Sequence, residues 1–263
     1  MAFGSFPDAP SGQMWITGDQ GGRTISRLTF RNRPAGQNVM VLYNVSNLKI
    51  DLIDFDTVPE GIYIWNSHDI EIGRIRARNI FGPYTRTTFH SGNLIQATNS
   101  KRLHIHDLKM DQPDTVPSGY TAYGTEDIIH IGGDPGAWGG DSWAAPFLVE
   151  RFAIDGGAWQ SHSGSGVFVG DGGGGKYVWI RDGILINPGQ VGVNIGEDGP
   201  YRFEDISIKA TRGNEGIQLR TNYAEFGGMK VQWPGQAINT MGHTYTTIAP
   251  NNWNAILDLR IAL

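Results

Sequence analysis

A pattern of alternating apolar residues recurs along the chain and limits what it can fold into. Each copy reads apolar, any, apolar, two polar residues, apolar, any, apolar, as in LHIHDLKM at 103–110, and further copies begin at Leu48, Phe147 and Tyr201. A period of two is typical of a short strand that turns one side chain inward and the next outward. Each copy therefore predicts two short strands that meet at a bend.

A third short strand precedes each copy, as in GIYIWN at 61–66 and DIIHIGG at 127–133. Asn44, Asn66 and Asn99 each stand four residues before the first apolar position of the following copy. Asparagine tolerates a left-handed backbone and bonds within its own turn, so this recurrence predicts one turn shape stacked on itself.

Three strands and two bends, repeated about every 22 residues where uninterrupted, are typical of a parallel β-helix. An up-and-down barrel or a β-sandwich with similar alternation is the alternative, but neither needs stacked turns of one kind. Charged residues occupy the second polar place of the bend on different rungs: Arg27, Arg74, Asp107, Arg151 and Asp205. We expect these residues to stack as a surface ladder of mixed sign that contributes little stability.

The segments YNVSNLKI, WNSHDIEI and TNSKRLHI resemble the right-handed parallel β-helix superfamily, which includes pectate lyases, polygalacturonases, epimerases and phage tailspikes. The resemblance covers roughly residues 23–232. It implies an all-β chain that forms a single-stranded right-handed parallel β-helix of about eight rungs with terminal caps. We expect an N-terminal cap at 1–22, the β-helix at 23–239, and a C-terminal cap or oligomerisation strand at 240–263.

Composition narrows the possible partners. The net charge of -5 disfavours nucleic acid, and the absence of cysteine excludes disulfides, thiolate nucleophiles and Cys-ligated metals. No metal or other cofactor is implied, because neither an HExxH motif nor a calcium-binding nonapeptide occurs.

No apolar run is long enough for a membrane span, and residues 1–13 lack the features of a signal peptide. We therefore expect a virion or extracellular location reached without such a peptide, or otherwise a cytoplasmic one.

The repeat is stretched on three neighbouring rungs by long connections at 81–92, 111–126 and 132–146. Long loops on adjacent rungs are expected to pile up into one wall, where aromatic rings and polar groups suit sugar rings and their hydroxyls. The residues predicted to bind carbohydrate are Tyr84, Tyr120, Tyr123, Trp138, Asp141, Trp143, His162 and Arg220. The alternative is that the rings only pack the loops onto the rungs.

The densest group of ionisable residues supplies the catalytic candidates Glu126, Asp127, His130 and Asp134. Glycoside hydrolysis needs two carboxylates, and a lyase needs a base beside a neutralised uronate carboxylate. GTEDIIHIG has some likeness to the polygalacturonase motif NTDG, but the paired Asp motif, GHG and RIK of that family are absent. Glu126 and Asp127 have the alternative role of capping a turn. His130 alternates with isoleucines and is expected to point outward as a solvated strand residue.

Three functions follow from these patterns, and whether the protein is an enzyme stays open. The leading hypothesis is a polysaccharide-binding spike or fibre protein of a phage or phage-derived particle, a homotrimer that recognises a cell-surface glycan and either depolymerises it or only binds it. The alternative is a polysaccharide lyase or glycoside hydrolase acting on an acidic polysaccharide. The third is a structural solenoid in an assembly.

Overall fold

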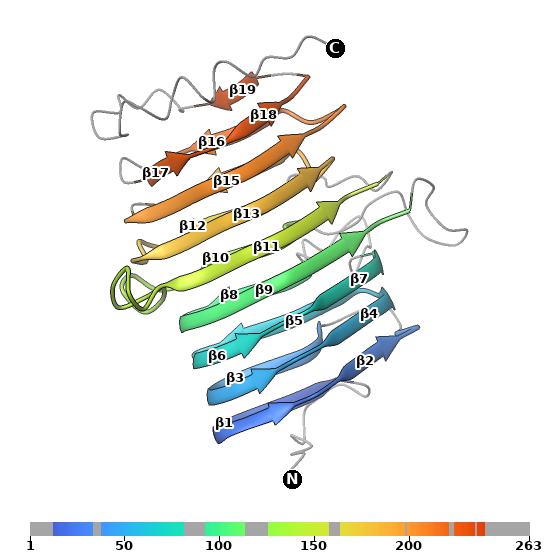
Figure 1. Ribbon diagram of the computed structural model, residues 1–263, viewed down its shortest axis with the longest axis vertical. Helices are drawn as coiled ribbons and strands as arrows, with labels where there is room; N and C mark the ends of the chain where they lie inside the picture. The colour runs from blue at the N-terminus through green and yellow to red at the C-terminus, as the bar shows by residue number, and fades with distance from the viewer. Residues whose placement is uncertain are drawn as a thin grey trace.

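The computed structural model describes residues 13–33, 38–81, 93–113, 126–157, 164–197, 199–220, 224–234 and 236–239. Within these ranges the chain is all-β, and its 19 strands belong to one large parallel sheet that does not close (Figure 1). The described residues contain no helix with the length and apolar character needed to span a membrane. The all-β fold with parallel pairing predicted from the sequence is thus confirmed.

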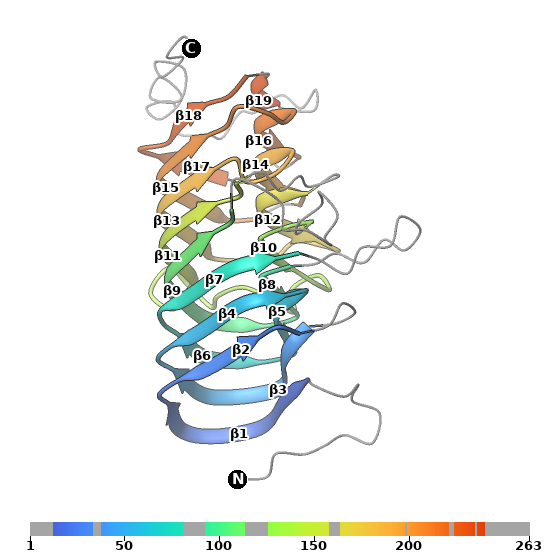
Figure 2. The same ribbon diagram turned by 90° about the vertical axis from the view of Figure 1, so that its right-hand side faces the viewer.

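Pairing between successive turns of the chain divides the strands into three ladders. Ladder A contains β1 (Met14–Ile25) and β3 (Asn38–Ile50) through their first halves, then β5 (Glu60–Trp65), β8 (Ile95–Thr98), β10 (Ile129–Gly132), β12 (Ser165–Asp171), β14 (Val191–Ile195), β16 (Glu215–Leu219) and β19 (Gln236–Asn239). Figure 2 shows these strands above one another, with β19 at the end opposite β1.

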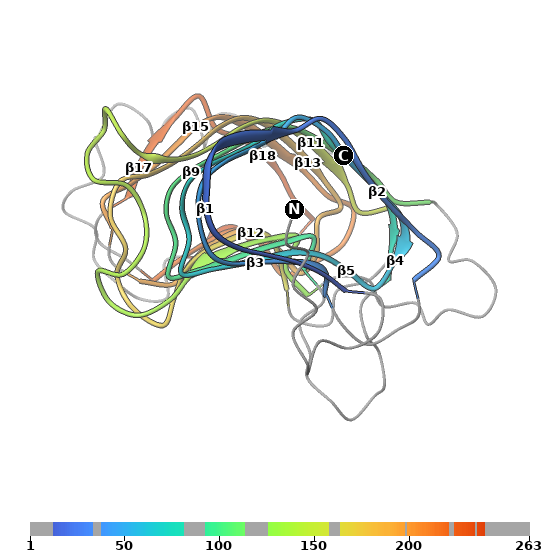
Figure 3. The ribbon, with the colours of Figure 1, turned by 90° about the horizontal axis from the view of Figure 1, so that it is seen from below.

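Ladder B takes the second halves of β1 and β3, then β6 (His68–Ile72), the first halves of β9 (Lys101–Asp111), β11 (Phe147–Asp155), β13 (Val178–Ile186) and β15 (Tyr201–Lys209), and β17 (Ala224–Gly227). Ladder C takes β2 (Leu28–Arg31), β4 (Ile53–Val58), β7 (Ile75–Ile80), the second halves of β9, β11, β13 and β15, and β18 (Lys230–Gln232). Seen from below, the turns overlie one another, which is consistent with a β-helix-like solenoid (Figure 3).

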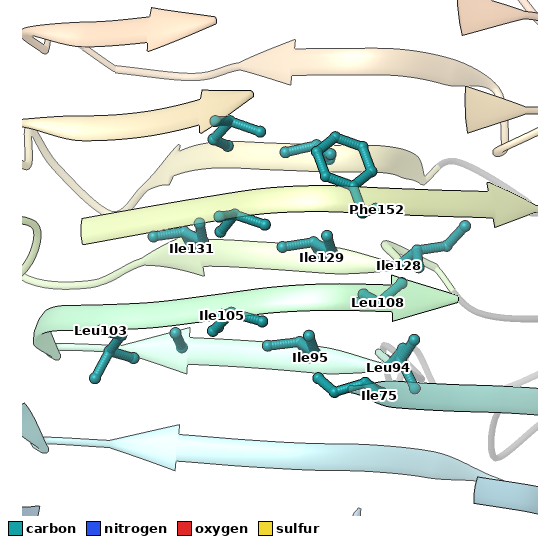
Figure 4. Packing of buried hydrophobic residues seen from close by; sticks show 14 of the residues in the cluster. Ile75, Leu94, Ile95, Leu103, Ile105, Leu108, Ile128, Ile129, Ile131 and Phe152 are labelled. Atoms are coloured by element: carbon teal, nitrogen blue, oxygen red, sulfur yellow. The ribbon is translucent and has the colours of Figure 1, made fainter. Parts of the chain in front are cut away.

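The core fills the inside of the stack with the apolar residues of the repeat. Leu103, Ile105, Leu108 and Met110, which the pattern places inward, are all buried. In Figure 4 the first three of these pack with Ile129 and other residues of ladder A. Each fully buried side chain of this kind stabilises the fold by about 1.5–3 kcal/mol. The alternation in the sequence therefore identified the core correctly.

The predicted stacked turn lies between ladders A and B. Asn44, Asn66 and Asn99 have φ angles of 52°, 50° and 50°, and the side-chain amide of Asn66 donates to Asn44 Oδ1 at 2.5 Å. Immediately after these residues, the hydroxyls of Ser67 and Ser100 accept hydrogen bonds from the backbone N–H of the turn before, at 3.0 and 3.2 Å. The turn therefore repeats in both backbone shape and hydrogen bonding.

The second bend, between ladders B and C, repeats in the same way. Arg74, Asp107, Arg151 and Asp205 have φ angles of 45°, 55°, 52° and 52°. Arg151 donates to both carboxylate oxygens of Asp107, at 2.8 and 3.1 Å. The predicted surface ladder of mixed sign is confirmed at these positions.

The long insertions occur at two different corners of the stack, and the predicted wall falls largely on residues outside the described ranges. Residues 82–92 and 114–125 lie outside the described residues, but each precedes a strand of ladder A and so joins ladder C to ladder A. The loop at 133–146 follows β10 and joins ladder A to ladder B, at the left of Figure 1. The spacing between repeats shows how long an insertion is, but it does not show at which corner of the rung the insertion occurs. The sequence therefore did not separate the two corners.

The ends of the chain bear on the predicted caps. Strand β1 starts at Met14 and already pairs with β3 there, inside the range 1–22 expected to form the N-terminal cap. Residues 1–12 and the predicted C-terminal segment 240–263 lie outside the described residues. The division into caps and solenoid therefore stays a prediction.

Candidate functional site

The outward surface of ladder A carries two columns of side chains in strict register. The first column runs Tyr63, Gln96, His130, Phe168, and the second runs Tyr43, Trp65, Thr98, Gly132. We call these residues, with the acidic residues that contact them, the ladder A face. Neighbouring strands lie about 4.8 Å apart, so side chains two rungs apart are separated by roughly 10 Å.

Three aromatic rings meet at one end of this face. Trp65 lies 5.2 Å from Tyr43 and 6.2 Å from Tyr63, measured between ring centroids. Its side chain is 42% exposed, which makes it one of two large apolar residues exposed in the described part of the chain. Sequence reasoning missed these rings because it searched the loops. The available signal was their place at the outward positions of VMVLYN and GIYIWN.

His130 lies at the centre of the face and is held by two carboxylates. Its Nδ1 is 3.0 Å from Asp127 Oδ2, and its Nε2 is 3.3 Å from Asp171 Oδ2. Phe168 from the next rung packs edge-on against the imidazole, with centroids 5.0 Å apart. His130 therefore points outward as expected but is only 9% exposed, which corrects the expectation of a solvated residue.

The charge of His130 follows from this setting. Burial disfavours the imidazolium, but hydrogen bonds and charge from Asp127 and then Asp171 outweigh it and raise the pKa of His130 to about 9. The hydrogen bond from His130 in turn lowers the pKa of Asp171. A pKa raised in this way favours a protonated His130 between the two carboxylates at neutral pH, a state in which the ring can donate a proton.

Asp127 also has a structural role. Its Oδ1 accepts the backbone N–H of Ser165 at 2.7 Å, while its own N–H donates to Asn93 Oδ1 at 3.2 Å. The turn-capping alternative therefore applies to Asp127 in addition to its contact with His130. Glu126 is half-buried directly before it.

A fourth acidic residue, Glu60, occupies the equivalent position two rungs from Asp127 in ladder A, with Asn93 between them. Glu60 is buried and forms no ion pair with the described residues, and burial raises the pKa of its carboxyl to about 7. No sequence signal distinguished Glu60, because its burial depends on the neighbouring rungs.

Asp134 closes a turn beside the face. Its carboxylate accepts from Asn99 Nδ2 at 2.9 Å, and its backbone N–H donates to Asn99 Oδ1 at 2.6 Å. These contacts make Asp134 part of the stacked asparagine turn. They do not bring it to His130.

The loop aromatics at 133–146 pack the loop onto the rungs. Trp138 is 1% exposed, stacks on Tyr201 with centroids 6.0 Å apart, and donates from Nε1 to the carbonyl oxygen of Gly173 at 3.2 Å. This corrects the expectation of a ring open to sugar. Trp143 is half-buried beneath Arg202, whose guanidinium carbon lies 3.9 Å from the ring centroid.

The remaining carbohydrate-binding candidates lie in different places. Asp141 is exposed at the corner toward ladder B, where it accepts from Arg102 at 2.7 Å. Arg220 is exposed at the end of β16 and donates to Gln218, which continues the first column of the ladder A face through Asn194. Tyr84, Tyr120, Tyr123 and His162 lie outside the described residues.

A second surface, on ladder B, is concave, but charged residues in its lining form ion pairs with one another. A pocket of about 320 Å³ is lined by polar residues that include Lys49, Asp69, Glu71, Arg102 and His104. Lys49 pairs with Glu71 at 2.8 Å and Arg102 pairs with Asp69 at 2.7 Å. The pocket lining has no phenylalanine, tyrosine or tryptophan ring, so the ladder A face is the stronger candidate for binding sugar.

Across the described ranges, histidine and acidic side chains form no group of three or more suited to hold a metal ion. Comparisons of the chain with protein-family models, with curated proteins and with solved structures found no match. The resemblance to the right-handed β-helix superfamily therefore stays a prediction.

Proposed function

We propose that this protein binds a polysaccharide through the ladder A face. The observation that carries the proposal is the aromatic cluster of exposed Trp65 with half-buried Tyr43 and Tyr63. This cluster is in register with Gln96 and with His130, which contacts the Asp171 carboxylate. Aromatic rings accept the C–H faces of sugars, while amides and carboxylates bond the hydroxyl groups.

The proposal extends to the kind of particle. The protein is a spike-type, right-handed, single-stranded parallel β-helix of about eight rungs from a phage or phage-derived particle, acting as a homotrimer on a cell-surface glycan. Support comes from the three stacked ladders and from the resemblance of YNVSNLKI, WNSHDIEI and TNSKRLHI to that superfamily. Sedimentation of the intact protein tests the trimer, and a monomer at working concentration contradicts it.

A second candidate function is cleavage of the bound polysaccharide. It is favoured by the proximity of an imidazolium, His130, to the exposed carboxylate of Asp171, since hydrolysis and elimination both need a proton donor and a proton acceptor. Incubation with neutral and uronate-containing polysaccharides distinguishes the two functions. New reducing ends or the ultraviolet absorbance of unsaturated uronate support cleavage, and neither signal appears if the protein only binds.

The direct test of binding is a glycan array or a capsule pull-down with the intact protein. Wild-type protein is expected to bind, and the Trp65→Ala variant is expected to bind about tenfold more weakly. Ile184→Ala is the control, because Ile184 is the other large apolar residue exposed within the described ranges and lies in ladder C. Absence of any glycan binding contradicts the proposal and favours the structural solenoid.

A further inference from the structure

The second column of the ladder A face continues beyond Gly132 to a carboxylate. Gly132 pairs with Asp171 across a register shift, so the column runs Tyr43, Trp65, Thr98, Gly132, Asp171. Trp65 and Asp171 are three rungs apart, which is roughly 14 Å. An aromatic ring and a carboxylate thus mark the two ends of one strip along the stack.

The middle of this strip has no large side chain. Thr98 is small, and a Cβ added at Gly132 would lie 2.5 Å from the backbone oxygen of Asp171, so only glycine fits there. Gln96 and His130 stand beside these two residues in the first column. A chain of sugar rings laid along the strip would meet the ring of Trp65, then half-buried Thr98 and Gln96, and then the carboxylate of Asp171, because one sugar residue is about as long as the spacing between rungs.

The strip is negatively charged at the end formed by Asp171. His130, Asp127 and Asp171 together carry two carboxylates and one imidazolium, and Asp127 is buried. The group as a whole therefore carries net negative charge, and it reaches the surface through Asp171, whose side chain is 61% exposed. Glu197 is exposed beside the neighbouring Gly170, and Arg220 lies further along at the end of β16.

We infer that the ladder A face takes a linear glycan of at least three sugar residues without carboxylate, sulfate or phosphate groups, laid along the stacking axis from Trp65 to Asp171. Hydroxyl or ammonium groups of the glycan donate to the Asp171 carboxylate, whereas an anionic group there is repelled. The net charge of -5 on the whole chain also repels anionic glycans, over a longer range. The inference rests on the proposed function, since it specifies the ligand of the same face.

The test is an array that carries neutral, amino-sugar and acidic glycans, each from disaccharide to hexasaccharide. Binding is expected for neutral or amino-sugar members of three or more residues. Strongest binding to uronate, sialylated or sulfated members, or equal binding of disaccharides and hexasaccharides, overturns the inference while the proposed function survives. Absence of binding to every member overturns the proposed function and the inference with it.

Two variants test the role of the Asp171 carboxylate on the same array. Asp171→Asn is expected to reduce the preference for neutral over acidic glycans by about fivefold, since one charge near the ligand is removed. Asp182→Asn is the matched control, because Asp182 is also an exposed aspartate but lies at the bend between ladders B and C. An unchanged preference in Asp171→Asn, or an equal change in Asp182→Asn, contradicts the role of Asp171. Circular dichroism of both variants verifies that each is folded.

Discussion

His130 Nδ1 and Asp127 Oδ2 lie 3.0 Å apart, and both side chains are buried where a strand of ladder A begins. The other oxygen of Asp127 accepts the backbone N–H of Ser165 on the next rung. The pair therefore links the candidate site to the stacking of the rungs, and its ionisation affects both stability and binding.

The first prediction concerns alkaline pH. Because the pKa of His130 is raised from 6.5 to about 9, its charge stabilises the fold fully below pH 6.5, and that stabilisation is lost as the pH rises through 9. The free energy of unfolding is expected to fall by up to about 3 kcal/mol between pH 6 and 10. Urea unfolding of the wild type and of His130→Gln measures this. A decrease of the same size in His130→Gln contradicts the prediction.

Glu60 gives the second prediction, in a lower pH range. Burial raises its pKa from 4.5 to about 7, so the folded state is stabilised below pH 4.5, and this contribution is lost as the pH rises to 7. Glu60→Gln is therefore expected to be more stable than the wild type by about 3 kcal/mol at pH 8 and nearly equal to it at pH 4. The measurement is urea unfolding at both pH values, with the exposed Glu197→Gln as control. An equal gain at both pH values contradicts the assignment.

The third prediction tests the stacked turn. Asn66 has a φ of 50° and donates to Asn44 Oδ1. Replacement by alanine is expected to lower the free energy of unfolding by about 1–2 kcal/mol, because alanine resists the left-handed backbone. Asn66→Gly keeps the backbone freedom and loses only the side-chain hydrogen bond, so its loss is expected to be smaller. Thermal unfolding compares the two variants, and a larger loss in the glycine variant counts against the role of backbone conformation.

Trp138 and Trp65 supply the fourth prediction, since one ring is buried and the other exposed. Trp138→Ala is expected to lower the free energy of unfolding by about 3–5 kcal/mol, because it leaves a cavity against Tyr201. Below its unfolding temperature this variant keeps the glycan affinity of the wild type. Reduced affinity with unchanged stability would place Trp138 in the binding surface after all.

The repeat allowed much of the fold to be predicted, because every rung uses the same geometry. Alternation fixed the inward residues such as Leu103 and Ile105, and the recurring Asn44, Asn66 and Asn99 indicated a turn whose backbone is indeed repeated. These features depend on residues close together in the sequence, so a single chain reveals them.

The candidate site was less predictable because it depends on contacts between rungs. His130 is covered by Phe168, and Trp138 lies against Tyr201, in both cases through residues distant in sequence. The sequence shows the charge of Asp127, but not that its carboxylate contacts both His130 and the backbone N–H of Ser165. Trp65 was overlooked because an outward residue in a strand looks the same in sequence whether its neighbours leave it exposed or cover it.

The most direct measurement of the central claim is the glycan affinity of the intact wild-type protein, of Trp65→Ala and of Ile184→Ala on one array. Trp65 and Ile184 are 42% and 48% exposed, so both truncations remove apolar surface that the described fold does not bury. If the ladder A face is the binding site, the wild type and Ile184→Ala bind the same glycans with equal affinity. Trp65→Ala then binds them about tenfold more weakly. Equal binding by all three proteins, or no binding by the wild type, would contradict it.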